Sequence, residues 1–159
     1  MLIFTDAGYK KGVSSHGFVA KHWNGAVIKV ESFVGMETDS IRSEIASIVS
    51  ALNWVNGLKK YPKRQVRIYT DCLPIYEAVY GINKHSIDVT YIKHQLKQTN
   101  AKLLWRKRNA VEVAHILANK QMKYKNKHTT INGSKVKYNC EGIAKFKSKK
   151  KGTYKNKIS

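Results

Sequence analysis

The sequence predicts an α/β protein with a five-stranded mixed sheet flanked by helices, and three observations support this fold class. Two apolar runs that end in aspartate, LIFTD and VRIYTD, have the length and composition of buried strands. A β-hairpin signal follows the first run. Strand and helix patterns then alternate along the chain, and three hairpin-linked strands followed by such alternation are typical of a mixed sheet covered by helices.

The first part of the predicted sheet consists of three strands joined by short turns. These strands are expected at residues 1–6, 16–22 and 26–34. Asn24-Gly25 lies between the second and the third. This dipeptide favours a type I′ turn, in which both central residues have positive φ, so it predicts a β-hairpin.

A long amphipathic helix is expected after these strands, over residues 40–56. Its apolar residues recur at helical spacing: Ile41, Ile45, Ile48, Leu52 and Val55. Asp39 or Ser40 is suited to cap the helix, because a short polar side chain accepts a hydrogen bond from the first backbone N–H groups. Gly57 supplies the stop.

The second part of the chain alternates strands with helices. Strands are expected at residues 65–71 and 102–106. Pro74 suits the first turn of a short helix that ends near Gly81. Another helix is expected to begin at Ser86, and four residues follow it at helical spacing: Val89, Ile92, Lys93 and Leu96. The last helix is expected over residues 110–122.

The chain divides by composition into two parts. Residues 1–122 are expected to form one domain, and residues 123–159 a lysine-rich C-terminal extension with twelve lysines and a single acid, Glu141. The first half of the extension allows a small hairpin around Asn132-Gly133. The second half has the composition of a segment that is disordered in isolation.

The excess of basic residues indicates the kind of partner. Lys and Arg number 30 against 10 Asp and Glu, which gives a net charge of +20 at pH 7. Nucleic acid is the simplest partner for such a charge. A membrane is not expected, because no segment is long and apolar enough to span a bilayer. The start of the chain does not resemble a signal peptide, and Cys72 and Cys140 do not make a disulfide framework, so we expect a cytoplasmic protein with free thiols.

Three acids, Asp6, Glu44 and Asp71, are expected to meet in space. Asp6 and Asp71 each close an apolar run, which places them at the carboxyl ends of two inner strands, the edge where open α/β sheets bind ligands. Glu44 lies early in the long helix. Acids avoid burial unless they are paired or bind metal, so the trio suggests a divalent-metal site. The alternative of a surface charge is stronger for Glu44, since exposed helix glutamates are common.

Five segments, in this order, resemble ribonuclease H type 1: TDAGYKKG, the hairpin, SEIASIVSAL, IYTDCLPIYEAV and AHILANK. The resemblance covers about residues 1–122. It implies a metal-dependent endonuclease that hydrolyses the RNA strand of RNA/DNA hybrids. It also implies catalytic and metal-binding roles for Asp6, Glu44 and Asp71, and it places His115 where the family most often has a fourth acid.

The implied mechanism uses two divalent ions, Mg²⁺ or Mn²⁺. Two such ions about 3.5–4 Å apart can activate water and support both the attacking and the leaving oxygen of a phosphodiester. Asp6 is expected to bridge the ions, and Glu44 and Asp71 to complete the two sites. His115 carries no fixed negative charge, so the second ion should bind less tightly and Mn²⁺ is favoured by the softer imidazole. The alternative for His115 is a packed helix histidine.

The resemblance also places four residues against the backbone of the hybrid: Lys10, Lys11, Ser40 and Arg42. Each is expected to contact phosphate without reading sequence, while groove shape and 2′-OH groups select the hybrid. Cys72 is not expected to be a nucleophile, because no base accompanies it. Two other functions stay open: a weak or inactive nucleic-acid-binding protein on the same fold, for which His115 and the basic extension argue, and a nuclease for another nucleic-acid structure.

Overall fold

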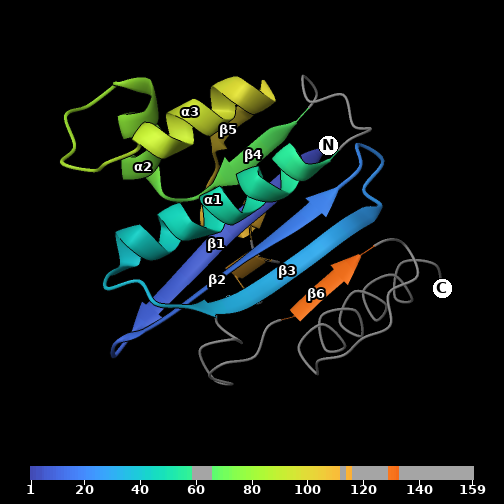
Figure 1. Ribbon diagram of the computed structural model, residues 1–159, viewed down its shortest axis with the longest axis horizontal. Coiled ribbons are helices and arrows are strands. Elements are labelled where there is room, and N and C mark those ends of the chain that lie inside the picture. The colour runs from blue at the N-terminus through green and yellow to red at the C-terminus, as the bar shows by residue number, and fades with distance from the viewer. Residues whose placement is uncertain (59–65, 112–113, 116–128, 133–159) are drawn as a thin grey trace.

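The protein is described by a computed structural model, which places residues 1–58, 66–111, 114–115 and 129–132 (Figure 1). The strands are β1 (Leu2–Lys10), β2 (Val13–Lys21), β3 (Val27–Gly35), β4 (Arg67–Thr70), β5 (Lys102–Trp105) and β6 (Thr129–Asn132). The helices are α1 (Ser40–Gly57), α2 (Leu73–Tyr80) and α3 (Thr90–Thr99), followed by the 3₁₀ turn η2 (Arg108–Val111).

The strands form one mixed sheet in the order β5-β4-β1-β2-β3-β6. β1, β2 and β3 are antiparallel neighbours, whereas β4 pairs parallel with both β1 and β5. The predicted five-stranded mixed sheet, β5 to β3, is therefore confirmed. β6 was not predicted as a strand of this sheet; it extends the sheet by pairing antiparallel with the outer edge of β3.

β1 is longer than the sequence predicts, and this changes the place of Asp6. The strand was expected to end at Asp6, but it continues to Lys10 because its β2 edge stays paired as far as Lys10 and Val13. The parallel pairing with β4 stops earlier, at Phe4 and Tyr69. Asp6 thus lies in the middle of β1, two residues beyond the last parallel pair, rather than at the strand end.

The two hairpins use different turns. Lys11 and Gly12 close the β1–β2 hairpin with φ of 51° and 75°, the two positive values that a type I′ turn requires. The predicted β2–β3 hairpin is present, but its predicted type I′ turn is wrong, since Gly25 has a positive φ of 86° and Asn24 does not. The Gly25 N–H donates to the His22 carbonyl over 2.9 Å, so Gly25 follows a tight turn as the left-handed residue of a three-residue loop.

α1 follows its sequence prediction closely except at its end, where Gly57 is still helical and Leu58, in an extended conformation, is the C-cap. Asp39 is the N-cap, and its Oδ1 accepts a hydrogen bond from the Arg42 N–H over 2.8 Å. The predicted apolar stripe faces the sheet: Ile48, Leu52 and Val55 are buried, and Ile41 and Ile45 pack at the margin. α1 lies across β1 and β2 (Figure 1), and this packing brings the face that carries Glu44 over the sheet.

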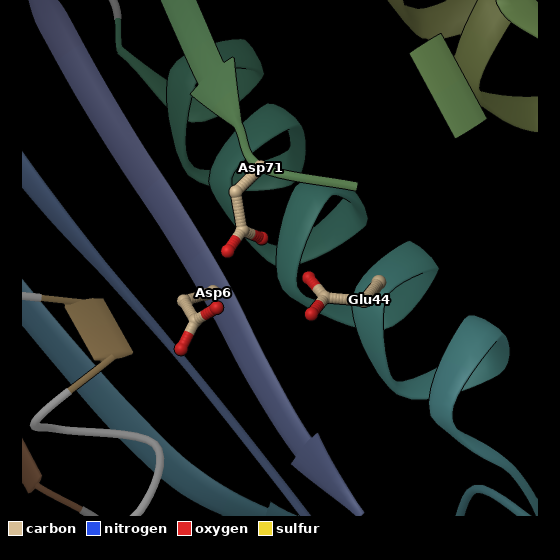
Figure 2. A group of neighbouring side chains, drawn as sticks. All are labelled: Asp6, Glu44 and Asp71. Carbon is tan, nitrogen blue, oxygen red and sulfur yellow. The ribbon is translucent and has the colours of Figure 1, made fainter. Parts of the chain in front are cut away.

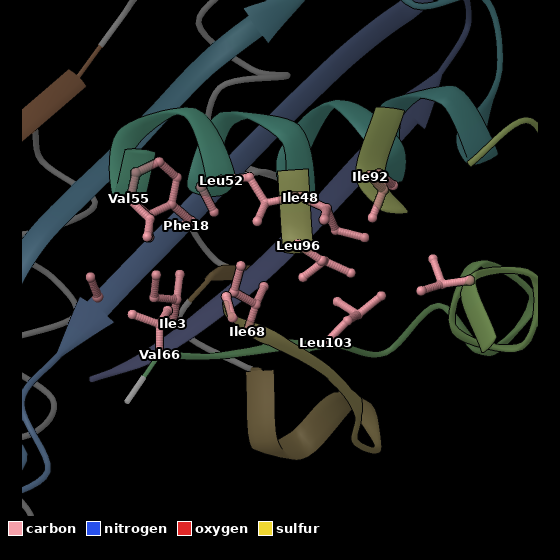
Figure 3. Packing of buried hydrophobic residues seen from close by; sticks show 14 of the residues in the cluster. Ile3, Phe18, Ile48, Leu52, Val55, Val66, Ile68, Ile92, Leu96 and Leu103 are labelled. Atoms are coloured by element: carbon pink, nitrogen blue, oxygen red, sulfur yellow. The ribbon is translucent and has the colours of Figure 1, made fainter. Parts of the chain in front are cut away.

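The hydrophobic core fills the space between α1, α3 and one face of the sheet (Figure 3). Its fully buried members come from both layers: Ile3, Phe18, Ile48, Leu52, Ile68, Ile92 and Leu103. Because strand residues alternate between faces, these positions also identify the opposite face, which carries Leu2, Phe4, Lys21, Arg67, Tyr69 and Lys102.

α2 has the predicted boundaries. Pro74 lies in its first turn, and Gly81 ends it in the left-handed conformation with a φ of 67°. α3 begins at Thr90, so the predicted cap at Ser86 is wrong; instead the Asp88 side chain accepts a hydrogen bond from the Thr90 N–H over 3.0 Å.

The last predicted helix, residues 110–122, lies mostly outside the described residues. Ala114 and His115 are helical, after the turn η2. The hairpin beyond Asn132 and the segment 133–159 lie outside the described residues as well, and the domain boundary near residue 122 stays a prediction. In the part of the chain that the structure places, no helix has both the length and the apolarity needed to cross a bilayer.

A buried polar cluster of Ser14, His16 and Glu37 ties the loop after β3 to β2. The Ser14 hydroxyl donates to Glu37, and His16 Nε2 lies 3.0 Å from Glu37 Oε2. Hydrogen bonds hold the pKa of Glu37 below its usual value, although burial acts in the opposite direction. A Cβ at Gly35 would lie 1.7 Å from Glu37 Oε2, so only glycine leaves room for this cluster.

Candidate active site

The three predicted acids meet at one place (Figure 2). One carboxylate oxygen from each of Asp6, Glu44 and Asp71 lies within 4.8 Å of the others. Asp71 follows β4 directly and Glu44 belongs to the early part of α1. The parallel register that pairs Phe4 with Tyr69 sets Asp6 beside Asp71 two residues further on. The meeting point thus lies where β1 and β4 cease to pair and α1 crosses them.

Burial makes this cluster unlike an ordinary group of surface acids. Asp6 is fully buried, and two of the oxygens, Asp6 Oδ1 and Glu44 Oε2, are buried without a hydrogen-bond partner among the described residues. An unpaired buried carboxylate oxygen costs free energy, which a cation bound to it would offset. Carboxylate oxygens are also the ligands that Mg²⁺ and Mn²⁺ prefer, so the residues present fit a divalent cation. The burial of Glu44 Oε2 argues against the alternative that this glutamate is only an exposed surface charge.

The electrostatics of the cluster support the same conclusion. Burial, together with the neighbouring charge of Asp71, raises the pKa of Asp6 to about 6, although His115 and Arg108 act in the opposite direction. Burial and the charges of Asp6 and Asp71 raise the pKa of Glu44 well above its usual value. The charge of Asp71 thus makes ionisation of Asp6 and Glu44 more costly, and a bound cation would relieve this repulsion.

His115 lies against the acids, as its place in the sequence pattern predicts. Its Nδ1 is 2.8 Å from Asp6 Oδ2, and its side chain is 31% exposed. An ionised carboxylate only accepts hydrogen bonds, so Nδ1 carries the proton whenever Asp6 is ionised. The four residues expected to form the site are therefore in one group.

Arg108 is a site residue that the sequence analysis missed. Its Nε donates to Asp71 Oδ2 over 3.0 Å, and its side chain is 65% exposed. Trp105 supports the same residue through an Nε1–H bond of 3.2 Å to the Asp71 carbonyl oxygen. The available signal was the basic run Arg106-Lys107-Arg108, which follows β5, the strand parallel to β4, just as Asp71 follows β4.

The four residues expected to contact nucleic acid are exposed on the surface: Lys10, Lys11, Ser40 and Arg42. Lys10 ends β1, four residues or about 13 Å along the strand from Asp6. Arg42 already engages Asp39, with Nε 3.4 Å from its Oδ2. The contacts of these residues with nucleic acid stay predictions.

Cys72 follows Asp71 but does not have the properties of a nucleophile. Burial is the main cause that raises the pKa of its thiol to about 11, so the thiol is protonated at neutral pH. Nucleophilic cysteines need the thiolate. This agrees with the sequence expectation.

No protein-family model and no curated protein matches the sequence, whereas solved structures match the fold. LC11-RNase H1, isolated from compost by a metagenomic approach, has a TM-score of 0.71 and 19% identity, covering 77% of this chain and 95% of that chain. RNase H1 from the archaeon Halobacterium salinarum has a TM-score of 0.66 and 12% identity, covering 77% and 97%. LC11-RNase H1 in complex with an RNA/DNA hybrid has a TM-score of 0.66 and 18% identity, covering 77% and 96%. The chain therefore has the ribonuclease H-like fold.

Proposed function

We propose that this protein is a metal-dependent endonuclease that hydrolyses the RNA strand of RNA/DNA hybrids. The observation that carries the proposal is the convergence of Asp6, Glu44 and Asp71 within 4.8 Å, with buried carboxylate oxygens left for a cation. The solved RNase H1 structures of the same fold support it, and one of them holds an RNA/DNA hybrid. The net charge of +20 suits a polyanionic substrate.

Asp6, Glu44 and Asp71 are the residues that would hold two Mg²⁺ or Mn²⁺ ions, with His115 as the fourth member of the site. When bound, such ions supply an activated water and stabilise charge at the phosphorus and the leaving oxygen. The chain's own part is to present these carboxylates together. Asp6 and Asp71 come from strands in fixed register, and Glu44 comes from a helix packed on those strands.

His115 has a second task, which is to hold Asp6 in its ionised form. The hydrogen bond and the partial charge of the imidazole both lower the pKa of Asp6 against the larger effect of burial. With a pKa of about 6, Asp6 is mostly ionised at neutral pH, as a cation ligand must be.

Arg108 acts on Asp71, just as His115 acts on Asp6. Its guanidinium donates to Asp71 and its positive charge lowers the cost of ionising Asp6 and Glu44. It therefore partly neutralises the acidic cluster from outside. Because the side chain is largely exposed, water screens this effect, and the arginine remains free to move when a cation binds.

The test is cleavage of an RNA/DNA hybrid labelled on the RNA strand, with Mg²⁺ or Mn²⁺, beside single-stranded RNA and both homoduplexes. We expect cleavage of the RNA in the hybrid, and we expect Asp6→Asn, Glu44→Gln and Asp71→Asn to abolish it. Hybrid binding in EDTA should stay within a few fold of wild type in each variant. Asp88→Asn, a matched change at a carboxylate before α3, should cleave normally. Full activity of Asp71→Asn would contradict the proposal.

A second candidate function is a nucleic-acid-binding protein with weak or no catalysis. It is favoured by two contacts: His115 occupies Asp6 Oδ2 at 2.8 Å, and Arg108 occupies Asp71 Oδ2 at 3.0 Å. Both contacts compete with a cation for carboxylate oxygens. Absence of cleavage with every substrate, together with tight and salt-sensitive hybrid binding, would select this function. Cleavage of a homoduplex alone would instead select a nuclease for another structure.

A further inference from the structure

A row of cations crosses the sheet at the end opposite to the acids. Lys21, Arg67 and Lys102 belong to β2, β4 and β5, and the strand register aligns them: Lys21 pairs with Leu2, Leu2 with Arg67, and Arg67 with Lys102. Residues in register point to the same face. We call Lys21, Arg67 and Lys102 the basic row. With neighbouring strands about 4.8 Å apart, it spans about 14 Å across the sheet.

The basic row lies on the face opposite α1. The residues next to its members along the strands, Ala20, Ile68 and Leu103, belong to the core under α1, and alternation turns the row itself to the other side. Arg67 and Lys102 are exposed. Arg67 is the first residue of β4 and Asp71 follows its last residue. The two are four residues apart, which is about 13 Å along the strand.

This arrangement is unfavourable for the isolated protein. Arg67 and Lys102 are direct neighbours across two strands, and like charges in that relation repel. Neither forms an ion pair with a carboxylate among the residues that the structure places. An anion bound across the row would remove the repulsion, and a phosphodiester backbone offers a series of them.

An aromatic side chain stands at the same end of the sheet. Trp23, in the β2–β3 hairpin, is 47% exposed, and the Arg67 guanidinium lies 5.1 Å from the centre of its ring. Stacking on the indole holds the guanidinium in one orientation and leaves its edge N–H groups for a phosphate, which arginine binds in a forked geometry. A site with both an oriented arginine and an adjacent lysine fits phosphate better than scattered surface lysines do.

We propose that the basic row is a second nucleic-acid contact, which binds backbone phosphates away from the acidic cluster. The proposal rests on the proposed function for the class of partner, but not for cleavage. A duplex has one base pair per about 3.4 Å of axis, so a separation of about 13 Å corresponds to about four base pairs. The row would therefore strengthen the grip on long substrates without taking part in the reaction.

The test is metal-free binding of a labelled 24-base-pair RNA/DNA hybrid, measured by fluorescence anisotropy in EDTA over a series of KCl concentrations. Arg67→Glu/Lys102→Glu is compared with Lys93→Glu/Lys97→Glu, which makes the same change in net charge at exposed positions of α3. We expect the row variant to bind about tenfold more weakly at 0.1 M salt. Its plot of log K against log salt should be shallower by about 1 to 2, because each lost phosphate contact removes about 0.9 from the slope.

Equal losses in the two double variants would overturn the proposal, since they would reflect net charge alone. An unchanged salt slope in the row variant would overturn it too. So would a row variant that loses binding to vesicles containing phosphatidylserine while keeping its affinity for the hybrid. Thermal unfolding of both variants checks that they are folded. The milder Arg67→Gln/Lys102→Gln should also make the plot of log K against log salt shallower, by a smaller amount. Because the measurement needs no metal and no turnover, it is independent of whether the protein cleaves the hybrid.

Discussion

The stability of the metal-free protein should depend on the ionisation of Asp6. The folded-state pKa of this residue is raised from 3.8 to about 6, mainly by burial. Ionisation is therefore harder in the folded than in the unfolded chain. The free energy of unfolding is therefore highest below pH 4, where Asp6 is protonated in both states, and it falls as the pH rises through about 6. Above pH 7 the difference corresponds to about 3 kcal/mol of unfolding free energy.

Asp6→Asn removes this titration, and so it should stabilise the metal-free protein at high pH. The gain over wild type should be close to zero near pH 3, about half of the full value at pH 5, and about 3 kcal/mol above pH 7. The asparagine keeps the size of the side chain and can still accept a hydrogen bond from His115. The gain therefore reports the buried charge rather than a change in packing.

The assay is urea unfolding in EDTA at several pH values, with Asp88→Asn as the matched control. Hydrogen bonds to Thr90 hold the pKa of Asp88 below its usual value, so this variant should gain no stability as the pH rises. Wild type that is more stable than Asp6→Asn at pH 7.5 in EDTA would refute the reasoning. So would a difference between them that does not vary with pH. Adding excess Mg²⁺ should raise the melting temperature of wild type and leave that of Asp6→Asn nearly unchanged.

Three further predictions follow from the contacts of the site and of the β3 end. Arg108→Ala frees Asp71 from its ion partner and should lower the Kd for Mg²⁺, measured by calorimetry, by up to about fivefold, the range for an exposed pair. His115→Asp supplies a fourth carboxylate and should lower that Kd by about tenfold, whereas unchanged Mg²⁺ affinity would show that this position is no ligand. Gly35→Ala should destabilise the fold by about 1–3 kcal/mol in urea unfolding, because its Cβ would lie 1.7 Å from the carboxylate of the buried polar cluster. The control for the glycine change is Gly57→Ala, where a Cβ meets nothing within 4 Å; it should be neutral or stabilising by up to about 1 kcal/mol.

The order of the elements could be predicted from the sequence because its signals are local. The cap at Asp39 and the start and end of α2 at Pro74 and Gly81 each depend on a few neighbouring residues. Periodicity identified the faces of α1 in the same way. The errors also came from local signals. Asn24-Gly25 is compatible with more than one turn, and the loop between the strands selected the three-residue form.

The three acids of the candidate site could be named from the sequence, since two of them end apolar runs that had to be inner strands. The burial, contacts and pKa values of these acids could not be predicted from the sequence. That Glu44 Oε2 is buried depends on how α1 packs over β1. Arg108 reaches Asp71 across 37 residues of sequence, and the basic run that contains it does not indicate which acid it contacts. The burial that raises the pKa of Asp6 is likewise a property of the packed molecule.

The sequence by itself determined the fold class, the order of β1 to β5 and of α1 to α3, and the identity of the acids, because hydrophobic periodicity, caps and turn residues act over a few positions. Only the tertiary structure decided that β1 runs past Asp6, that its pairing with β4 stops short of the acids, and that Arg67 and Lys102 stand side by side. These features depend on strand register and on contacts between residues far apart in the chain. Such contacts form only when the whole sheet assembles.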